Sequence, residues 1–295
     1  MSKAQLTEIL QVNAENPPPE NANPEILREW FEAINAMTPV AEGAKIEPTS
    51  LGDFEGELIT LPGSEPSRLV IYYHGGGFMI GSPRSHRVIA SNLARTSGAT
   101  VLSVGYRLAP EHPAPTAHED AFVAYGWALK KGFVPSAIAL SGDSAGGNLA
   151  LATAIRARDA GLPLPSSIVL MSPALDLADE MESHRTVTDA PLLTLELMGL
   201  FNAIYVGDGD RRSPAVTPFH SEMSGLPPIL VHVGSWEILR DDSVVIVERI
   251  KAVGGNAELK VWDGMVHSWQ LFAPMLDEGM ASIEEAGDFI RSRFG

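Results

Sequence analysis

Strand-like and helix-like segments alternate along most of this chain, from residue 69 onward. Short apolar runs that suit buried strands are each followed by a longer stretch with helical spacing of apolar residues. This alternation predicts a mainly parallel sheet with helices on both faces, because each helix returns the chain to the start of the next strand. We expect strands at 69–73, 100–104, 137–140, 167–171, 229–234 and 259–262, helices at 84–96, 116–130, 145–160, 242–253 and 275–294, and an antiparallel edge pair at 45–51 and 56–61.

Two segments, residues 1–40 and 179–220, fall outside the alternation. The first contains two helical stretches, 3–13 and 24–37, and the second of these opens with Asn23 as a cap and Pro24 in the first turn. The second segment contains an amphipathic stretch, 192–205. Such a stretch can simply pack its apolar stripe on the core. We expect instead that both segments together form a helical cap over a cleft, because both carry apolar faces that need cover.

A serine motif marks the end of one expected strand. Residues 141–148 read Ser-Gly-Asp-Ser-Ala-Gly-Gly-Asn, between strand 137–140 and a helical stretch. In this G-x-S-x-G pattern the central serine occupies a strained strand-to-helix turn, so its neighbours must be small. The pattern predicts Ser144 as a nucleophile. It also places the Ala145 N–H, at the start of a helix, where an oxyanion would form.

A run of glycines follows the earlier strand 69–73 and reads His-Gly-Gly-Gly-Phe from His74 onward. Consecutive glycines suit a loop whose N–H groups must approach another atom closely. A flexible turn or a phosphate-binding loop would also use glycines, but the dinucleotide spacing G-x-G-x-x-G is absent here. We therefore expect two of the three loop glycines, Gly76 with Gly77 or Gly75, to donate to an oxyanion together with the Ala145 N–H of the serine turn. His74 is expected to pack in the loop rather than to react.

Together these motifs resemble the hormone-sensitive-lipase-like family of bacterial α/β-hydrolase esterases. The matching pieces occur in the family's order and span most of the chain, at 74–77, 106–115, 142–148, 234–242 and 264–269. The resemblance implies an α/β-hydrolase fold, with a catalytic domain of residues 41–178 and 221–295 and a helical cap of residues 1–40 and 179–220. One position departs from the family pattern, since Glu237 stands where the family usually has Asp.

The histidine of the site is expected to follow the serine and the acid along the chain. Four histidines follow Ser144, namely His184, His220, His232 and His267. His232 alternates within strand 229–234 and suits the sheet interior, while His184 and His220 lie in irregular segments. His267 follows strand 259–262 on a loop, where strand ends build a site. Its position and the resemblance both indicate His267 as the base.

The acid should follow an earlier strand, and Glu237 follows strand 229–234 after two residues. Asp241 and Asp242 are alternatives, although both also suit the first turn of the next helix, where acids complement the helix dipole. Asp263 is too close to the histidine in sequence. We expect Glu237 to hold the tautomer of His267 and to stabilise the imidazolium that forms.

The proline-rich segment 106–115 is interpreted as structural. Its polar side chains Arg107, Glu111 and His112 are expected to pair with one another and hold the turn. Its three prolines favour a cis peptide bond in the segment. Asp143, beside the expected nucleophile, is predicted to hydrogen-bond its own turn and to point away from the serine.

Composition excludes several classes of function. The chain has 37 acidic and 21 basic residues, a net charge of −16, which disfavours nucleic acid and anionic membrane surfaces as partners. It has no cysteine and no apolar run long enough to span a membrane. No signal-peptide pattern is evident, which favours a cytoplasmic enzyme. The early histidines show no metal-ligand spacing, so no metal and no cofactor are expected.

The sequence thus predicts a serine carboxylesterase that hydrolyses short- to medium-chain acyl esters through Ser144, His267 and Glu237 and an acyl-enzyme. The expected partner is a small-molecule ester, and a homo-oligomer is compatible with the sequence. A hydrolase of amides or lactones on the same fold is the first alternative. A non-catalytic ligand-binding protein is the second, and an interfacial lipase is disfavoured by the lack of a long hydrophobic lid.

Overall fold

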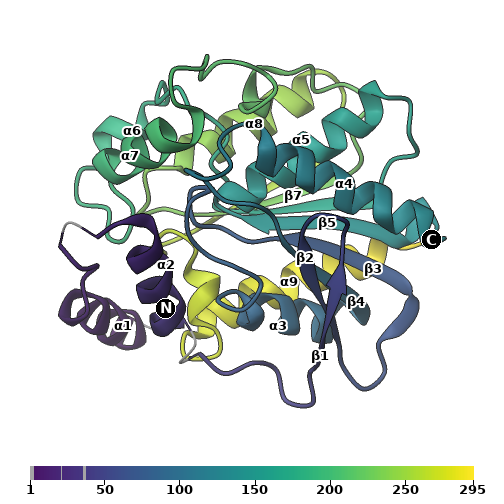
Figure 1. Cartoon of the computed structure of the whole chain (residues 1–295), viewed down its shortest axis with the longest axis horizontal. Helices are drawn as coiled ribbons and strands as arrows, with labels where there is room; N and C mark the ends of the chain where they lie inside the picture. Colours follow the sequence, from purple (N-terminus) through teal and green to yellow (C-terminus); the bar gives the residue numbers. More distant parts are fainter. Residues whose placement is uncertain (1–2, 21, 36–37) are drawn as a thin grey trace.

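The computed structural model describes residues 3–20, 22–35 and 38–295. Within them, eight strands form one sheet in the order β1-β2-β4-β3-β5-β6-β7-β8 (Figure 1). From β4 to β8 all neighbouring strands are parallel, whereas β1 and β2 form the predicted antiparallel pair at one edge. The bounds are β1 (Lys45–Ser50), β2 (Glu55–Thr60), β3 (Glu65–Tyr73), β4 (Ala99–Gly105), β5 (Ile138–Asp143), β6 (Ser167–Met171), β7 (Ile229–Gly234) and β8 (Ala257–Trp262).

Helices cover both faces of this sheet, as the alternation predicts (Figure 1). Alternate side chains of β3 enter the two cores, since Ile71 packs in the cluster of one face and Val70 in that of the other. One face carries α3 (Arg87–Ser97) and α9 (Asp277–Arg293), and the other carries α4 (Thr116–Lys130), α5 (Ala145–Asp159) and α8 (Arg240–Ala252). No described helix is both long and apolar enough to cross a membrane.

The start of α3 differs from its prediction. The sequence pattern predicts a helix from residue 84, whereas α3 begins at Arg87. The Ser82 hydroxyl accepts hydrogen bonds from the N–H groups of Arg84 and Ser85, at 3.0 and 3.3 Å, and so holds these residues in a turn. Serine side chains compete with helical hydrogen bonding in this way.

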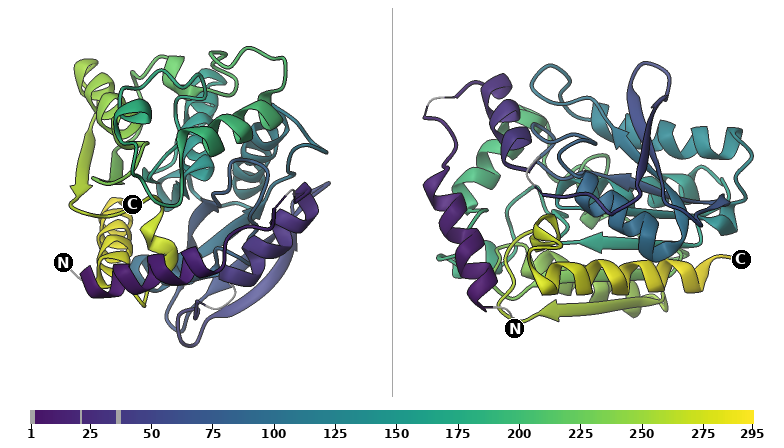
Figure 2. Two further views of the ribbon diagram at one scale, coloured as in Figure 1. Left: turned by 90° about the vertical axis from the view of Figure 1, so that its left-hand side faces the viewer. Right: turned by 90° about the horizontal axis from the view of Figure 1, so that it is seen from below.

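In the described parts of the two segments outside the alternation there are four α-helices, α1 (Lys3–Glu15), α2 (Pro24–Asn35), α6 (Ser183–Thr186) and α7 (Leu195–Val206). All four lie at the end of the sheet where the parallel strands end, with α1 and α2 on one side and α6 and α7 on the other (Figures 1 and 2). Asn23 caps α2 as predicted, since its side chain accepts the Ile26 N–H at 2.9 Å. Residues 1–2, 21 and 36–37 of the expected cap and its helices lie outside the described residues.

The side chain of Arg28 fastens α2 to the main domain. Its guanidinium donates to the carbonyl oxygens of Met79 and Ala109, at 2.8 and 2.7 Å, and pairs with Glu111. A planar guanidinium can serve several acceptors at once in this way. The segment that follows the glycine loop is therefore held directly by α2.

The predicted pairing within segment 106–115 is wrong. Arg107 binds Asp120 on α4 and Glu111 binds Arg28 on α2. Each charge therefore reaches an opposite charge on another element, 13 and 83 residues away in sequence. The expected cis peptide bond is present, and it occurs twice, at Ala109–Pro110 and Ala114–Pro115.

Candidate active site

Ser144 occupies the strand-to-helix turn that its motif predicts. It lies between β5 and α5, has φ 51° and is 8% exposed. Its N–H donates to the Met171 carbonyl at 2.9 Å, which ties the turn to the neighbouring strand β6. A Cβ at Gly142 or Gly146 would overlap backbone atoms. The close approach of the chain on both sides therefore requires the small neighbours of the motif.

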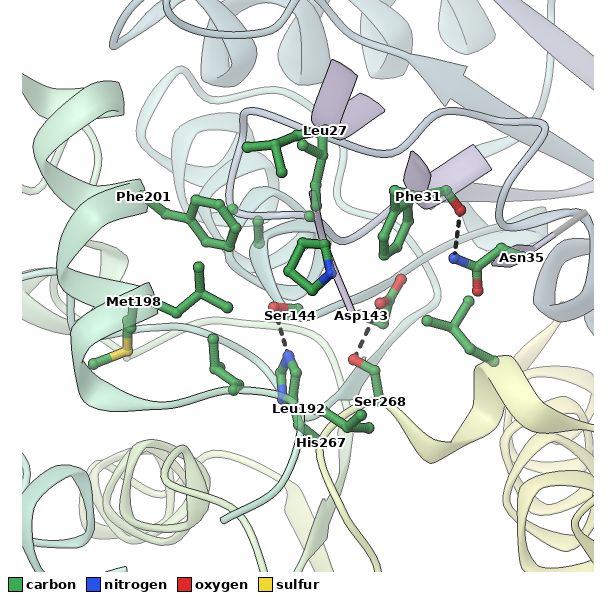
Figure 3. Close-up of a pocket in the computed structure, with 18 of the residues that line it drawn as sticks. Leu27, Phe31, Asn35, Asp143, Ser144, Leu192, Met198, Phe201, His267 and Ser268 are labelled. Atoms are coloured by element: carbon green, nitrogen blue, oxygen red, sulfur yellow. Dashed lines mark hydrogen bonds between the residues drawn. The ribbon is translucent and has the colours of Figure 1, made fainter. Parts of the chain in front are cut away.

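His267 and Glu237 lie in a line of contacts with this serine. His267 Nε2 is 3.0 Å from Ser144 Oγ, and His267 Nδ1 is 2.9 Å from Glu237 Oε2. Figure 3 shows the first of these contacts on the floor of a cavity. The order Ser–His–acid is the geometry in which a histidine can accept the serine proton while the acid holds its other nitrogen.

The alternative acids lie elsewhere. Asp241 accepts the N–H of Ser183 at 2.9 Å, and Asp242 is fully buried against His184 at 2.6 Å. Both carboxylates thus join α8 to the α6 segment. His232 is buried in the sheet and contacts Ser282, as its strand position predicts.

The glycine loop gives its three N–H groups different environments. The Gly75 N–H donates to Asp143 Oδ1 at 3.0 Å and lies 3.2 Å from His86 Nε2. Within the described residues, no protein acceptor binds the N–H groups of Gly76 and Gly77. The expectation that Gly75 can serve as an oxyanion donor is therefore not retained, because its N–H is already engaged inside the protein.

Asp143 links three parts of the site instead of bonding its own turn. Besides Gly75, its carboxylate accepts from the Tyr72 hydroxyl at 2.5 Å and the Ser268 hydroxyl at 3.2 Å. It is 1% exposed, and Figure 3 shows it directed toward Ser268 and away from Ser144. The prediction that it bonds its own turn is wrong, because the glycine loop and the histidine loop come within reach only in the folded chain.

His74 is a packed residue, as expected. Its ring stacks on Tyr106 with centroids 4.2 Å apart. Burial, together with the nearby His86, lowers the pKa of His74 to about 3, so the ring is neutral at neutral pH. Burial likewise lowers the pKa of His118 to about 4.

These buried neutral rings predict a loss of stability in mild acid. Because the folded pKa lies below the ordinary value of about 6.5, the unfolded chain binds more protons as pH falls below 6.5. His74 and His118 should each lower the free energy of unfolding by about 2 kcal/mol by pH 5. Burial also lowers the pKa of His232. His184 opposes this loss, because the hydrogen bond and charge of Asp242 outweigh burial and raise its pKa.

Urea unfolding at pH 7, 6 and 5 measures the net effect. The midpoint concentration should fall with pH across this window, before most carboxylates titrate. A midpoint that stays constant or rises from pH 7 to pH 5 would contradict the assignment of neutral buried rings.

A cavity of about 480 Å³ opens above Ser144. Leu27 and Phe31 of α2 line one side and Met198 and Phe201 of α7 line another, with His267 below (Figure 3). The walls are mostly apolar and include Leu10, Trp30, Ile34, Pro191, Leu192, Leu193, Leu197, Leu200, Leu271 and Phe272. The two segments outside the alternation thus meet over one site.

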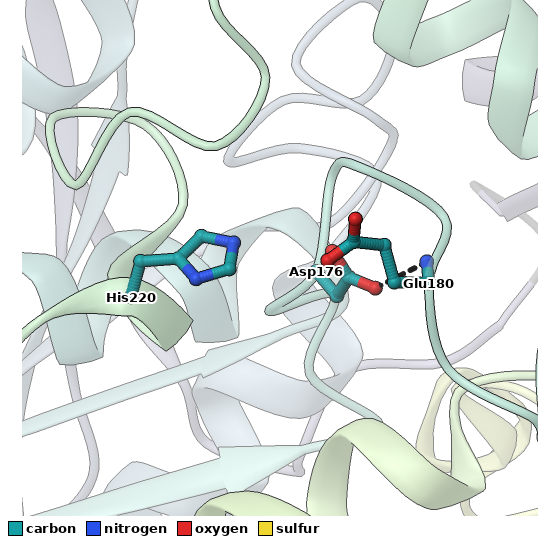
Figure 4. Close-up of side chains that lie close together, drawn as sticks. All are labelled: Asp176, Glu180 and His220. Atoms are coloured by element: carbon teal, nitrogen blue, oxygen red, sulfur yellow. Dashed lines mark hydrogen bonds between the residues drawn. The ribbon is translucent and has the colours of Figure 1, made fainter.

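Three neighbouring side chains, two carboxylates and one imidazole, are of the kinds that bind metal ions in proteins. Oxygen or nitrogen atoms of Asp176, Glu180 and His220 lie within 4.8 Å of one another (Figure 4). The Asp176 carboxylate already accepts the N–H groups of Ala178, Glu180 and Met181, and Glu180 pairs with Arg212. These hydrogen bonds and this ion pair give both carboxylates a structural role in the loop after β6.

Comparison with known proteins agrees with this architecture. A family model described as alpha/beta hydrolase fold matches residues 70–271. An acetyl-hydrolase of Streptomyces hygroscopicus is 39% identical over 83% of this chain and 86% of its own. An esterase of Acinetobacter venetianus is 34% identical over 96% of this chain and 94% of its own.

A crystal structure described as an esterase from the bacterial hormone-sensitive lipase family superposes with a TM-score of 0.96. It is 38% identical and covers 99% of both chains. The sheet order, the family match and this similarity over the full length confirm the predicted fold and the stated resemblance. The chain therefore belongs to the hormone-sensitive-lipase-like family of α/β-hydrolase esterases.

Proposed function

We propose that this protein is a serine carboxylesterase that acts on short- to medium-chain acyl esters through Ser144, His267 and Glu237. The observation that carries the proposal is the unbroken line of contacts from Ser144 Oγ through His267 to a buried Glu237, at 3.0 and 2.9 Å. Similarity to proteins named esterase and acetyl-hydrolase supports a carboxylic-ester hydrolase.

In the first half of the reaction His267 Nε2 takes the proton of Ser144 while Oγ attacks the ester carbonyl carbon. The carbonyl oxygen becomes an oxyanion, and the tetrahedral intermediate collapses as His267 returns the proton to the leaving alcohol. Water then attacks the acyl-enzyme with the same base, which releases the acid and restores the serine. Glu237 holds the Nδ1–H of His267 throughout and stabilises the imidazolium.

The proposed oxyanion hole consists of the N–H groups of Gly76, Gly77 and Ala145. Ala145 begins α5, so its N–H points out of a helix N-terminus, where negative charge is stabilised. Asp143 anchors the loop through Gly75 and leaves the next two N–H groups free of protein acceptors within the described residues. The anchored loop keeps these donors in place before substrate binds.

The proposed cap is formed by residues 1–40 and 179–220 on a catalytic domain of 41–178 and 221–295. Its support is that α1, α2 and α7 line the same cavity as Ser144 and His267. An apolar cavity of about 480 Å³ suits an uncharged acyl chain of limited length. A cytoplasmic location and a homo-oligomer stay predictions from the sequence.

A panel of p-nitrophenyl esters with acyl chains of two to sixteen carbons tests this proposal. We expect kcat/KM to be highest for roughly two to eight carbons and to fall steeply beyond, because residues of α2 and α7 line the cavity and limit the space for the acyl chain. Phe201 lies against Gly77 and lines the cavity, so Phe201→Ala should extend the accepted range to longer chains.

Leu195→Ala is the matched control, because Leu195 lies on the same helix but outside the cavity lining. It should leave the chain-length profile unchanged. No turnover of any ester, with the protein folded, would contradict the proposed activity. An unchanged profile in Phe201→Ala would contradict the proposed role of α7 as a wall of the acyl site.

A further inference from the structure

The carboxylate of Glu237 is completely buried, and both of its oxygens have partners. Oε2 faces His267, while Oε1 accepts hydrogen bonds from the Ser172 hydroxyl at 2.8 Å and from the Gly234 N–H at 2.5 Å. A buried charge without such bonds is strongly unfavourable. The Ser172 hydroxyl is thus the one side chain, besides His267, that is hydrogen-bonded to this carboxylate among the described residues.

Ser172 also contacts the loop that carries the base. It directly follows β6, has no exposed surface, and its N–H donates to the His232 carbonyl at 2.7 Å. Its Oγ accepts the N–H of Ser268 at 3.2 Å. Because a hydroxyl has one proton and two lone pairs, it can donate to the acid and accept from the residue after His267 at the same time.

We propose that Ser172 is a positioning residue that holds the Glu237 carboxylate and the His267 loop in a fixed position relative to each other. The inference rests on the proposed function, because it assigns a role relative to the Glu237–His267 pair. A glutamate has one more rotatable bond than an aspartate, so its carboxylate needs an additional anchor to present one oxygen to Nδ1. With Oε1 held by Ser172 and Gly234, Oε2 faces the imidazole.

The backbone conformation of Ser172 allows the contribution of its hydroxyl to be tested separately from its contribution to the backbone. Its φ is 44°, and that of Ser268 is 49°, both in the region that non-glycine residues rarely adopt. Glycine adopts such a φ without strain, whereas alanine does not. Ser172→Gly therefore keeps the backbone and removes the hydroxyl, and Ser172→Ala removes the hydroxyl in a strained backbone.

The test is a double-mutant cycle, read by steady-state hydrolysis of p-nitrophenyl butyrate. Ser172→Gly and Ser172→Ala should each lower kcat by about 10- to 100-fold, the effect of losing a hydrogen bond to a charged group, with KM changed by less than about threefold. In a Glu237→Gln background the same substitutions should lower kcat by less than about threefold further, because residues that act through one another are non-additive.

Ser167→Ala is the matched control. Ser167 lies at the start of β6, the strand that Ser172 follows, is equally buried, and its hydroxyl has no partner among the described residues. Its substitution should leave kcat and KM unchanged. Thermal unfolding midpoints of all variants report whether each is folded, and Ser172→Gly provides the kinetic answer if Ser172→Ala is unstable.

Two results would overturn the inference and leave the proposed function intact. The first is a Ser172→Gly variant with the full kcat of the unmodified protein. The second is a Ser172 substitution that lowers kcat by the same factor in the unmodified protein and in the Glu237→Gln background. Both results presuppose that Glu237→Gln alone is strongly impaired. A Glu237→Gln enzyme with the kcat of the unmodified protein would overturn both, since the acid itself would then be misassigned.

Discussion

Replacement of Ser144 by alanine should abolish nearly all ester hydrolysis in a protein that still folds. We expect kcat to fall by about 10⁴- to 10⁶-fold, because the substitution removes the atom that forms the acyl-enzyme, and residual turnover comes only from binding and the oxyanion donors. Folding should be retained, since alanine keeps the backbone N–H that bonds Met171. Steady-state ester hydrolysis measures kcat, and the thermal unfolding midpoint measures whether the variant is folded.

Covalent labelling provides the independent check. An organophosphate should modify Ser144 and block activity with a one-to-one stoichiometry, and mass spectrometry of peptides should find no other labelled serine. Ser141 is the nearby comparison, because it precedes the turn, is fully buried and lies within β5. Labelling at Ser141 with Ser144 unmodified, or wild-type turnover by Ser144→Ala, would show that the nucleophile is assigned wrongly.

Glu237→Gln should produce the second largest effect. The amide is nearly isosteric, but it cannot stabilise the imidazolium that forms as His267 takes the serine proton, and it favours the wrong tautomer. Loss of the acid in comparable triads lowers kcat by about 10⁴-fold, and KM should change little because the interaction strengthens only in the transition state. Steady-state kinetics on a saturating short-chain ester measures both constants.

Two neighbouring substitutions sharpen that result. Asp241→Asn should affect kcat far less, because Asp241 bonds the Ser183 N–H and not the imidazole. Glu237→Asp should retain part of the activity, since the charge survives while its reach shortens. If Asp241→Asn proved the more damaging of the two amide substitutions, the acid would have to be reassigned to Asp241.

Much of this protein could be predicted from local sequence patterns. Alternating apolar periods predict the strands and helices, because each element must bury one face, and they predict the mainly parallel sheet with its antiparallel edge pair, although not the order of its strands. The serine and glycine motifs are equally local, since a turn that brings backbone atoms into contact excludes any Cβ, as at Gly142 and Gly146. The prediction of Ser144, Glu237 and His267 as the reacting residues rests on the rule that strand ends carry the site, together with the family resemblance, and local patterns leave Asp241 as an alternative acid.

The tertiary structure decided what depends on distant partners. Whether Gly75 donates to an oxyanion depends on Asp143, and whether Glu111 pairs within its turn depends on Arg28. Ser172 has no sequence pattern that marks it, because its contact with Glu237 spans 65 residues. A hydrogen bond or ion pair is set by the position of both groups, and local patterns report only one of them. The sequence by itself therefore determined the layers of helices and sheet and the similarity of the motifs to the esterase family. The tertiary structure decided which polar groups already have a hydrogen-bond partner inside the protein and which do not.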